Sequence, residues 1–266
     1  MFAADELTDD GFLGGRLRVL QPRAGYRAAT DAVFLAAAVA ALPGQSVLEL
    51  GCGAGVASLC LGARVPGLVQ AGLELQPAYA DLARQNAARN GLPLEVVEGD
   101  LAAMPAAMPA ALRARSFDHV MANPPYFAPG DGTAAADPGR ETAQREATPL
   151  ADWVAAGLRR LRPGGWLTMI QQADRLPGLL CALAQGAGSI TVLPLASRAG
   201  RPAGRVIVQA RKGGRGRFTL AAPLLLHEGA AHDGDRDNHS DRAAAILRKG
   251  AALEIGPGGG GPPQPR

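Results

Sequence analysis

One run of residues, Phe117 to Phe127, constrains this chain more than any other. It begins as an apolar strand pattern and continues directly into an Asn-Pro-Pro-Tyr motif at residues 123–126. Neither proline has an N–H group to donate to a strand ladder, and each proline ring fixes φ, so no strand continues through them. The sequence therefore predicts a strand that ends at Asn123 and a rigid loop with an aromatic side chain at its tip.

Composition limits the class of protein. The 266 residues are 47% hydrophobic and 19% charged, with a net charge of +3, which is ordinary for a globular protein and too mild to indicate a nucleic-acid partner by itself. The three cysteines, Cys52, Cys60 and Cys181, fit neither a disulfide framework nor a zinc site, so no metal is predicted. The first ten residues carry four acidic side chains and no apolar core, unlike a signal peptide. The longest apolar run, 32–42, is shorter than the roughly 20 residues that a membrane span needs, so we expect a soluble, cytoplasmic protein with no membrane partner.

Short apolar strands alternate with helical patterns over most of the chain, which is typical of βαβ units and a parallel sheet. The expected strands cover residues 46–50, 68–75, 94–97, 117–122, 166–171, 190–195 and 206–210. The pattern predicts an α/β domain over residues 45–228. Residues 1–44 are expected to form an N-terminal extension with a short strand at 16–21 and a helix at 32–42, and residues 1–15 to be loosely held. Residues 229–266 are expected to form a C-terminal extension with a disordered tail.

Polar side chains mark the ends of four expected strands. Glu49, Glu74, Asp100 and Asn123 each stand at or next to a carboxyl end. Right-handed crossovers bring such ends to one edge of the sheet, where open α/β sheets bind ligands. Glycines at 51, 53 and 55 follow the first of these strands and allow close approach of a ligand to the backbone. A dinucleotide fingerprint needs its third glycine at position 56, which is a valine here, so a dinucleotide is not expected.

The glycine pattern after Glu49 resembles motif I of the class I S-adenosylmethionine-dependent methyltransferases, and Asn-Pro-Pro-Tyr resembles their motif IV. The layout over residues 25–210 is also similar to the bacterial tRNA1(Val) adenine-37 N6-methyltransferases, with Gly-Tyr-Arg at 25–27 and Thr-Asp at 30–31 before motif I. The resemblance implies a Rossmann-like fold with a mostly parallel seven-stranded sheet and an antiparallel last strand. It also implies a methyltransferase with S-adenosylmethionine as cofactor.

The resemblance implies roles for particular residues at the cofactor. Glu74 would accept hydrogen bonds from the ribose hydroxyls, and Asp100 would meet the adenine amino group. The backbone of the glycine loop would hold the methionine part, and Glu49 would steady that loop. The residues expected to bind the cofactor are Tyr26, Arg27, Thr30, Glu49, Gly51, Gly53, Gly55, Glu74, Leu75, Asp100, Leu101 and Asn123.

The substrate half of the site follows from the Asn-Pro-Pro-Tyr motif. An amine on an aromatic ring is a poor nucleophile because its lone pair is delocalised. The Asn123 side-chain oxygen and the Pro124 carbonyl can each accept one N–H, which orients the nitrogen, while Tyr126 can stack on the planar group. These three residues are the expected catalytic set. The residues expected to contact substrate are Pro125, Tyr126, Phe127, Arg140, Arg198, Arg201, Arg211 and Arg215, the last four because arginines can follow phosphates.

We therefore expect N6 methylation of adenine in tRNA or another structured RNA, with adenine 37 of tRNA1(Val) as the favoured target. The alternatives are a protein glutamine N5-methyltransferase, an rRNA or DNA amino-methyltransferase, and a non-catalytic RNA-binding protein of the same fold. Glutamine methyltransferases usually carry a helical domain before motif I, and only about 45 residues precede it in this chain.

Overall fold

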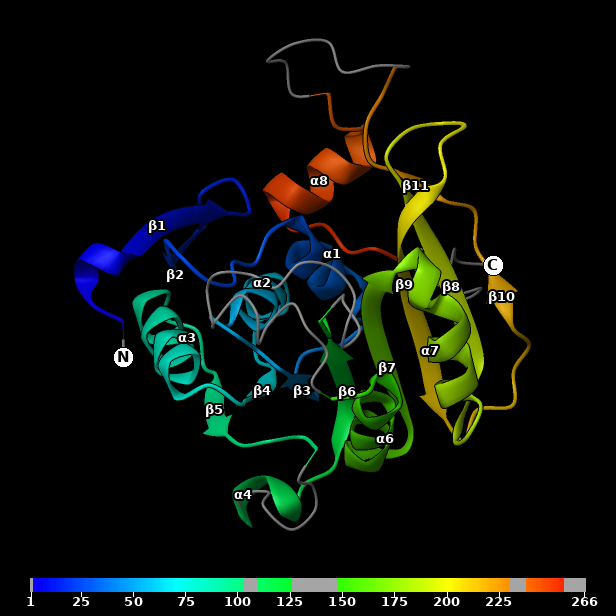
Figure 1. Ribbon diagram of the computed structural model, residues 1–266, viewed down its shortest axis with the longest axis horizontal. Helices are drawn as coiled ribbons and strands as arrows, with labels where there is room; N and C mark the ends of the chain where they lie inside the picture. The colour runs from blue at the N-terminus through cyan, green and yellow to red at the C-terminus, as the bar shows by residue number, and fades with distance from the viewer. Residues whose placement is uncertain (1, 103–109, 126–147, 230–237, 256–266) are drawn as a thin grey trace, which may run out of the picture.

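The computed structural model describes residues 2–102, 110–125, 148–229 and 238–255 (Figure 1). A sheet of nine strands forms its centre. In chain order the strands are β3 (Ser46–Leu50), β4 (Val69–Glu74), β5 (Glu95–Glu98), β6 (Phe117–Ala122), β7 (Leu161–Gln172), β8 (Ala187–Ala196), β9 (Ala203–Lys212), β10 (Thr219–Leu220) and β11 (Leu224–Leu225). The helices are α1 (Thr30–Ala38), α2 (Val56–Arg64), α3 (Pro77–Arg89), α4 (Ala110–Arg113), α6 (Leu150–Arg160), α7 (Leu176–Leu183) and α8 (Asp241–Lys249), with 3-10 turns η1 (Ala4–Glu6) and η2 (Ala173–Arg175).

The strand order confirms the expected fold class. Seven strands lie in the order β5-β4-β3-β6-β7-β9-β8. Neighbours from β5 to β7 are parallel, and β9, the last of these seven along the chain, is antiparallel to both β7 and β8. Two strands of two residues each, β10 and β11, add to the outer side of β8. The fold is therefore Rossmann-like, with a mostly parallel sheet.

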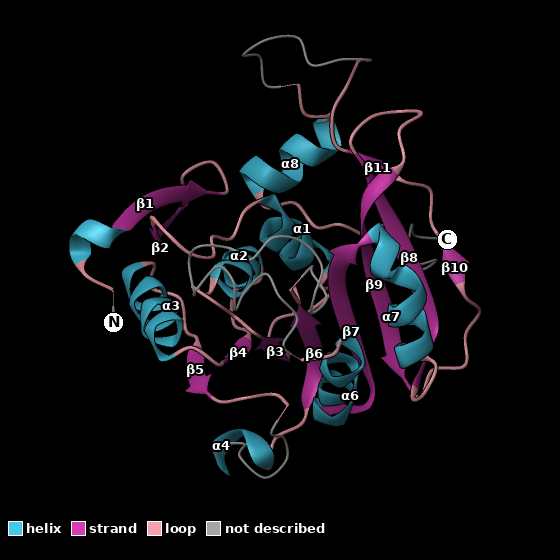
Figure 2. Ribbon diagram, viewed as in Figure 1, coloured by secondary structure: helices cyan, strands magenta, loops and turns pink. Residues whose placement is uncertain are grey.

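Helices cover both faces of this sheet (Figure 2). On one face α1, α2, α3 and α8 contribute buried apolar side chains to one core cluster, and on the other face α6 and α7 contribute to a second. Strand β6 lies at the centre, between β3 and β7, and all six of its residues are buried. Asn123 follows β6 at once, so the strand ends where the two prolines predict.

Residues 2–15 are ordered, so for these described residues the expectation that 1–15 are loosely held was wrong. Strand β1 (Leu7–Phe12) pairs antiparallel with β2 (Leu17–Pro22), which confirms the strand expected at 16–21. Two asparagines, Asn86 in α3 and Asn90 directly after it, support this hairpin as a further strand would. Asn86 exchanges hydrogen bonds of 2.8 and 3.0 Å with the backbone of Leu20, and Asn90 does so with Arg18 at 3.0 and 2.9 Å.

Helix α8 was also not expected. Ser240 caps its start, because the hydroxyl accepts a hydrogen bond of 3.2 Å from the Ala243 N–H, and Gly250 ends it with φ of 65°. Residues 256–266, where a disordered tail was expected, lie outside the described residues. The division into a domain and two extensions stays a prediction. No helix among the described residues is long and apolar enough to cross a membrane.

Candidate functional site

The glycine loop joins β3 to α2. Gly51, Gly53 and Gly55 all have positive φ, at 64°, 54° and 85°. At Gly51 a side chain is excluded twice, because an added Cβ would also lie 2.7 Å from the ring of Trp153. The N–H groups of Gly51 and Cys52 both donate to the carbonyl of Leu73, at 2.8 and 3.1 Å, which fixes the loop to the end of β4.

Glu49 lies beneath this loop and is only 4% exposed. One of its oxygens accepts two hydrogen bonds from Ser58, from the backbone N–H at 3.0 Å and from the hydroxyl at 2.5 Å. Burial raises the pKa of Glu49 to about 8, and the nearby Glu74 adds to the rise, while the bonds from Ser58 oppose it. The carboxyl therefore holds the first turn of α2 against the end of β3.

Glu74 ends β4 and faces the same loop. One oxygen accepts the Gly53 N–H at 2.8 Å and the other accepts the Gln76 N–H at 2.9 Å. Burial raises the pKa of this carboxyl, and the backbone donors oppose the rise. A carboxylate has about four lone-pair positions, so these two bonds leave Glu74 able to accept hydroxyl donors of a ligand.

Asn123 meets Tyr26 across the edge of the sheet. Its Nδ2 group donates to the Tyr26 hydroxyl at 3.3 Å. The backbone of Tyr26 is in turn fixed by Tyr79, whose hydroxyl accepts the Tyr26 N–H at 2.8 Å and donates to the Tyr26 carbonyl at 3.1 Å. Burial, with the charges of Glu49, Asp31 and Glu74, raises the pKa of Tyr26, so its hydroxyl stays protonated.

Gln171, at the end of β7, anchors the two prolines. Its side chain is fully buried, and its Nε2 group donates to the carbonyl of Pro125 at 3.2 Å and to that of Pro124 at 3.5 Å. Its own oxygen accepts the Gln172 N–H at 2.8 Å, which sets the direction of the amide. We did not expect this residue at the site, although a glutamine at the end of an apolar strand was a visible signal.

A cavity at the carboxyl edge of the sheet brings part of the predicted set together. It is lined by Tyr26, Gly51, Gly53, Glu74, Leu75, Gln76, Tyr79, Asn123, Pro125 and Trp153. Six of these were expected to bind the cofactor, and Pro125 to contact substrate. Trp153, from α6, was missed because nothing in its local sequence indicates that it faces the glycine loop. Its indole Nε1 is buried and has no hydrogen-bond partner in the part of the chain that the structure describes.

Other predicted residues do not line this cavity. Arg27 points to the N-terminal hairpin, where it pairs with Asp10 at 2.6 Å, and Thr30 is exposed at the start of α1. Asp100 and Leu101 are half-buried outside the lining residues, and the Asp100 carboxylate accepts the Ala102 N–H at 2.8 Å. Glu49 and Gly55 also fall outside the lining, and Pro124 is buried behind Pro125. Tyr126, Phe127 and Arg140 lie outside the described residues.

The predicted substrate arginines lie at two opposite edges of the sheet. Arg198 and Arg201 are in the loop from β8 to β9, at the carboxyl edge where Asn123 lies. Because β9 runs antiparallel to β7, Arg211 pairs with Trp166 near the other edge, and Arg215 follows it. Six residues of strand separate Arg205 from Arg211, or about 20 Å. The structure therefore does not bring Arg211 and Arg215 to the Asn-Pro-Pro loop.

Residues 29–177 match the model of a known family, described as the methyltransferase small domain, over more than half of the chain. The chain belongs to this family. It is a class I S-adenosylmethionine-dependent methyltransferase, as the sequence predicted, and the matched range includes the glycine loop, Glu74 and Asn123. The cavity suits this cofactor. The lining glycines Gly51 and Gly53 present backbone without side chains, and Glu74 offers buried acceptor positions beside them.

Two curated relatives of the methyltransferase share a name. A protein of Porphyromonas gingivalis strain ATCC 33277 is 31% identical over 177 residues, which cover 64% of this chain and 68% of the relative. A protein of Dickeya chrysanthemi strain Ech1591 is 28% identical over 220 residues, which cover 81% of this chain and 85% of the relative. Both relatives are named tRNA1(Val) (adenine(37)-N6)-methyltransferase.

Solved structures share the fold of the methyltransferase. A protein of Agrobacterium tumefaciens, Atu636, described as a predicted O-methyltransferase, superposes with a TM-score of 0.66 at 26% identity, covering 84% of this chain and 98% of that one. A type I restriction-modification methyltransferase subunit of Streptococcus thermophilus has a TM-score of 0.56 at 18% identity, covering 90% of this chain and 54% of that one. The second likeness concerns the fold alone.

Proposed function

We propose that the protein transfers a methyl group from S-adenosylmethionine to the N6 amino group of adenine in tRNA, with adenine 37 of tRNA1(Val) as the target. One observation carries this proposal. The Asn-Pro-Pro segment, held by Tyr26 and Gln171, borders the same cavity as the glycine loop and Glu74. The name shared by the two relatives supports the choice of nucleotide.

The acceptors of this segment fit an exocyclic amine. Bound at this site, the cofactor supplies an electrophilic methyl group on a positively charged sulfur. Asn123 and the Pro124 carbonyl are acceptors for the two N–H groups of the amine, which turn its lone pair toward the cavity. A carbonyl oxygen has two lone pairs, so the 3.5 Å bond from Gln171 leaves Pro124 able to accept a second donor. Gln171 and Tyr26 keep these acceptors in position before the substrate arrives.

Positive charge at the same edge supports an RNA substrate. Arg201 is exposed, and its guanidinium has no partner among the described residues, while Arg198 donates to the carbonyls of Glu228 and Gly229. Arginine forks contact phosphate groups of a nucleic acid well. A tRNA substrate agrees with the cytoplasmic location expected from the sequence.

Incubation with methyl-labelled S-adenosylmethionine and separate pools of tRNA, rRNA, DNA and total protein tests the proposal. We expect label in tRNA, recovered after digestion as N6-methyladenosine, and almost none with Asn123→Ala. Label on glutamine, on a ribose oxygen or mainly in rRNA or DNA would contradict it.

A further inference from the structure

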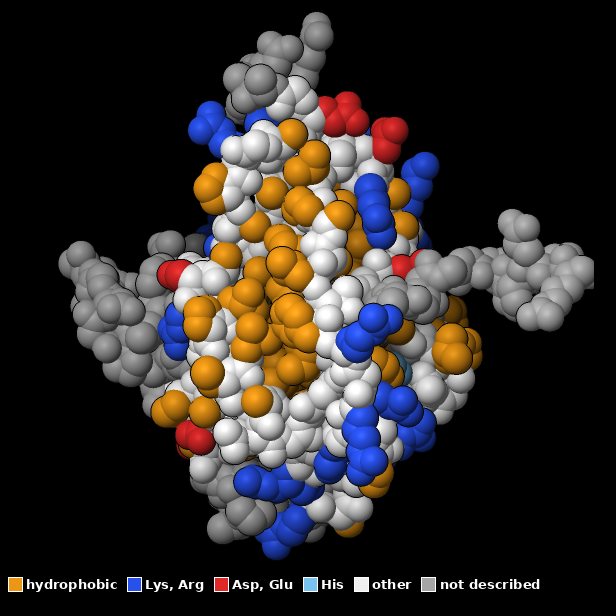
Figure 3. All heavy atoms as spheres, turned by 90° about the vertical axis from the view of Figure 1, so that its right-hand side faces the viewer, with side chains coloured by type: hydrophobic (Ala, Val, Ile, Leu, Met, Phe, Trp, Pro, Cys, Tyr) orange, Lys and Arg blue, Asp and Glu red, His pale blue; other side chains and the backbone are white. Residues whose placement is uncertain are grey.

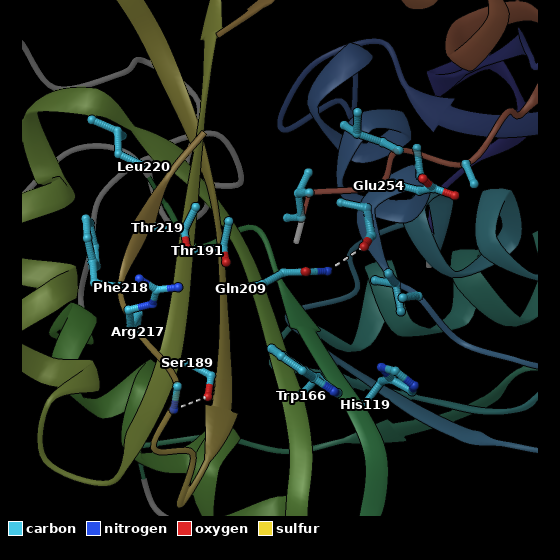
Figure 4. A pocket seen from close by; sticks show the side chains of 18 of the residues that line it. His119, Trp166, Ser189, Thr191, Gln209, Arg217, Phe218, Thr219, Leu220 and Glu254 are labelled. Atoms are coloured by element: carbon cyan, nitrogen blue, oxygen red, sulfur yellow. Dashed lines mark hydrogen bonds between the residues drawn. The ribbon is translucent and has the colours of Figure 1, made fainter. Parts of the chain in front are cut away.

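A second cavity, of about 890 Å³, lies at the other edge of the sheet and shares no lining residue with the cofactor cavity. It is hollowed between β7, β9 and β8 on one side and α1, the start of the segment after α8 and the chain around β10 on the other (Figures 3 and 4). Apolar side chains fill the centre of the hollow in Figure 3. This volume is within the range of about 300–1,000 Å³ that small-molecule sites occupy.

Small side chains leave the cavity open. Four consecutive positions at and just after the end of α1, Ala37 to Ala40, line one wall with three alanines and a valine, so this segment brings little more than methyl groups to the space. Trp166, Leu253 and Ile255 add larger apolar surfaces. Because these walls of the cavity are apolar, a ligand that binds there needs an apolar part to contact them.

A polar strip crosses the floor of the cavity. Thr191 and Gln209 face each other across β8 and β9, and Figure 4 shows their side chains together with that of Ser189. The Gln209 Nε2 group donates a hydrogen bond to the Ala38 carbonyl at 2.6 Å, and the Ser189 hydroxyl accepts the Gly216 N–H at 2.9 Å. Thr191 is only 4% exposed, yet its hydroxyl makes no hydrogen bond with any described residue. Because Thr191 lines the cavity, this hydroxyl can donate to or accept from a polar group of a ligand there.

Two other lining side chains, Arg64 and His119, have buried polar atoms without partners among the described residues. Arg64 donates through one terminal nitrogen to the carbonyls of Ala36 and Val39, but its Nε has no partner in the described part of the chain. His119 Nε2 lies 3.0 Å from a Gln45 oxygen that already accepts the Leu42 N–H at 2.9 Å, so Nε2 carries the proton and Nδ1 is a bare, unpaired acceptor.

Side chains of opposite charge lie on the two sides of the cavity rim. Arg217 stands on one side with a guanidinium that pairs with no acid among the described residues, and Glu254 stands across the cavity from it (Figure 4). An anionic group is attracted to the Arg217 side and repelled from the Glu254 side.

We propose that this cavity binds a small amphipathic anion, with an apolar ring system or short chain against Trp166 and the alanines and its carboxylate, sulfonate or phosphate toward Arg217 and Thr191. The proposal rests on this cavity alone and does not depend on the RNA substrate proposed above. The site would be a second ligand site on the methyltransferase, separate from the cofactor.

Two fluorescent dyes that differ by one anionic group test the proposal on the full chain. We expect 8-anilinonaphthalene-1-sulfonate to bind at one site per chain, about ten-fold more tightly than N-phenyl-1-naphthylamine, which has the same rings without the sulfonate. Arg217→Gln should remove most of this difference and leave the neutral dye unaffected. Glu254→Gln should strengthen binding of the sulfonated dye. The matched control is Arg23→Gln, an exposed arginine of the N-terminal hairpin, which should change neither dye.

Blocking variants locate the dye. Thr191→Phe fills the floor of the cavity and should abolish binding of both dyes. If this variant shows no thermal unfolding transition and so is not folded, Ala252→Trp, at an exposed position of the opposite wall, blocks the cavity instead. Equal affinity for the two dyes in the wild type would contradict the anionic class. Binding that survives both blocking variants would place the dye elsewhere and overturn the site. If sedimentation shows that the protein forms dimers and that the dimers do not bind dye, the cavity is covered by a second copy of the chain, which would overturn the proposed ligand site.

Discussion

Two buried carboxyl groups, Glu49 and Glu74, lie at the ends of neighbouring strands and hold opposite sides of the glycine loop through Ser58 and Gly53. Each is accessible to solvent over only a few per cent of its surface. Burial therefore disfavours their ionised forms, and the backbone and hydroxyl donors only partly offset this. The loop geometry therefore depends on two carboxyl groups whose pKa values burial raises.

The first prediction concerns the pH dependence of stability. The pKa of Glu49 rises from its usual 4.5 to about 8 on folding, so between those values the folded state binds more protons than the unfolded state. The stability contributed by the protonated group is complete below pH 4.5 and is lost as pH rises through 8. Relative to Glu49→Gln, the wild type should lose at most about 1.4 kcal/mol per pH unit across this window. Denaturant unfolding at several pH values measures it, and parallel curves for the two proteins would refute the role of Glu49.

The second prediction concerns Gln171. Gln171→Met keeps the volume but removes the donor to the two proline carbonyls, so kcat should fall by about ten- to a hundred-fold while cofactor affinity changes little. Gln171→Glu should retain more activity, because a buried carboxyl stays protonated and can still donate. The matched control is Gln209→Met, which removes a buried glutamine at the other edge and should lower stability without a selective loss of kcat. An unchanged kcat in Gln171→Met would show that the two prolines keep their position without the hydrogen bonds from Gln171.

At the scale of elements, the N-terminal hairpin and α3 act as one unit. Asn86 is fully buried, and besides its two bonds to Leu20 it donates to the Ala54 carbonyl in the glycine loop at 3.0 Å. The hairpin, helix and loop are therefore joined at one side chain. Asn90, one turn later, bonds to the hairpin at Arg18 but not to the loop.

The third prediction separates these two asparagines. Asn86→Ala leaves buried backbone groups of both the hairpin and the loop unpaired, so it should lower stability by about 2–3 kcal/mol and weaken cofactor binding. Asn90→Ala should lower stability by about 1 kcal/mol and leave the cofactor affinity as it is. Thermal unfolding and calorimetric titration with S-adenosylmethionine measure both. Equal cofactor affinity in the two variants would show that the contact of the hairpin and α3 with the glycine loop does not affect cofactor binding.

Sequence could predict the elements whose signals are local. The strand before Asn123 was predictable because proline cannot join a ladder, and the glycine loop because its residues need positive φ. The alternation at 16–21 also predicted the second strand of the hairpin, but not its partner β1 and not the support that β2 receives from asparagines about 70 residues away in sequence. Trp153 and Gln171 were not predicted as site residues, because only the folded sheet brings α6 and β7 beside the glycine loop and the prolines.

At the scale of the whole molecule, the two edges of the sheet differ in what they offer. The carboxyl edge carries the cavity that we assign to the cofactor, the Asn-Pro-Pro segment, Arg198 and Arg201. The other edge carries the large second cavity, with Arg211, Arg215 and Arg217 near it. Charge near the reacting nitrogen should matter more for RNA binding than equal charge at the far edge.

The fourth prediction compares matched pairs of arginines. Replacing Arg198 and Arg201 together by glutamine should weaken tRNA binding and flatten its dependence on salt, because two phosphate contacts are lost. The same change at Arg211 and Arg215 removes the same charge at the far edge and should have a smaller effect on both. Filter binding across a salt series measures this. A larger loss for the far-edge pair would mean that the RNA crosses the molecule by another path.

The most direct test of the central claim is single-turnover methylation of a tRNA1(Val) transcript by the wild type, Asn123→Ala and Asn123→Asp. The control is the same transcript with guanine in place of adenine 37. We expect the wild type to label only the adenine transcript. Asn123→Ala should lose most of the rate with its cofactor affinity intact, since the acceptor matters most in the transition state, and Asn123→Asp should keep part of the rate because an acceptor oxygen survives. Wild-type rates in Asn123→Ala, or equal labelling of the guanine transcript, would contradict the account.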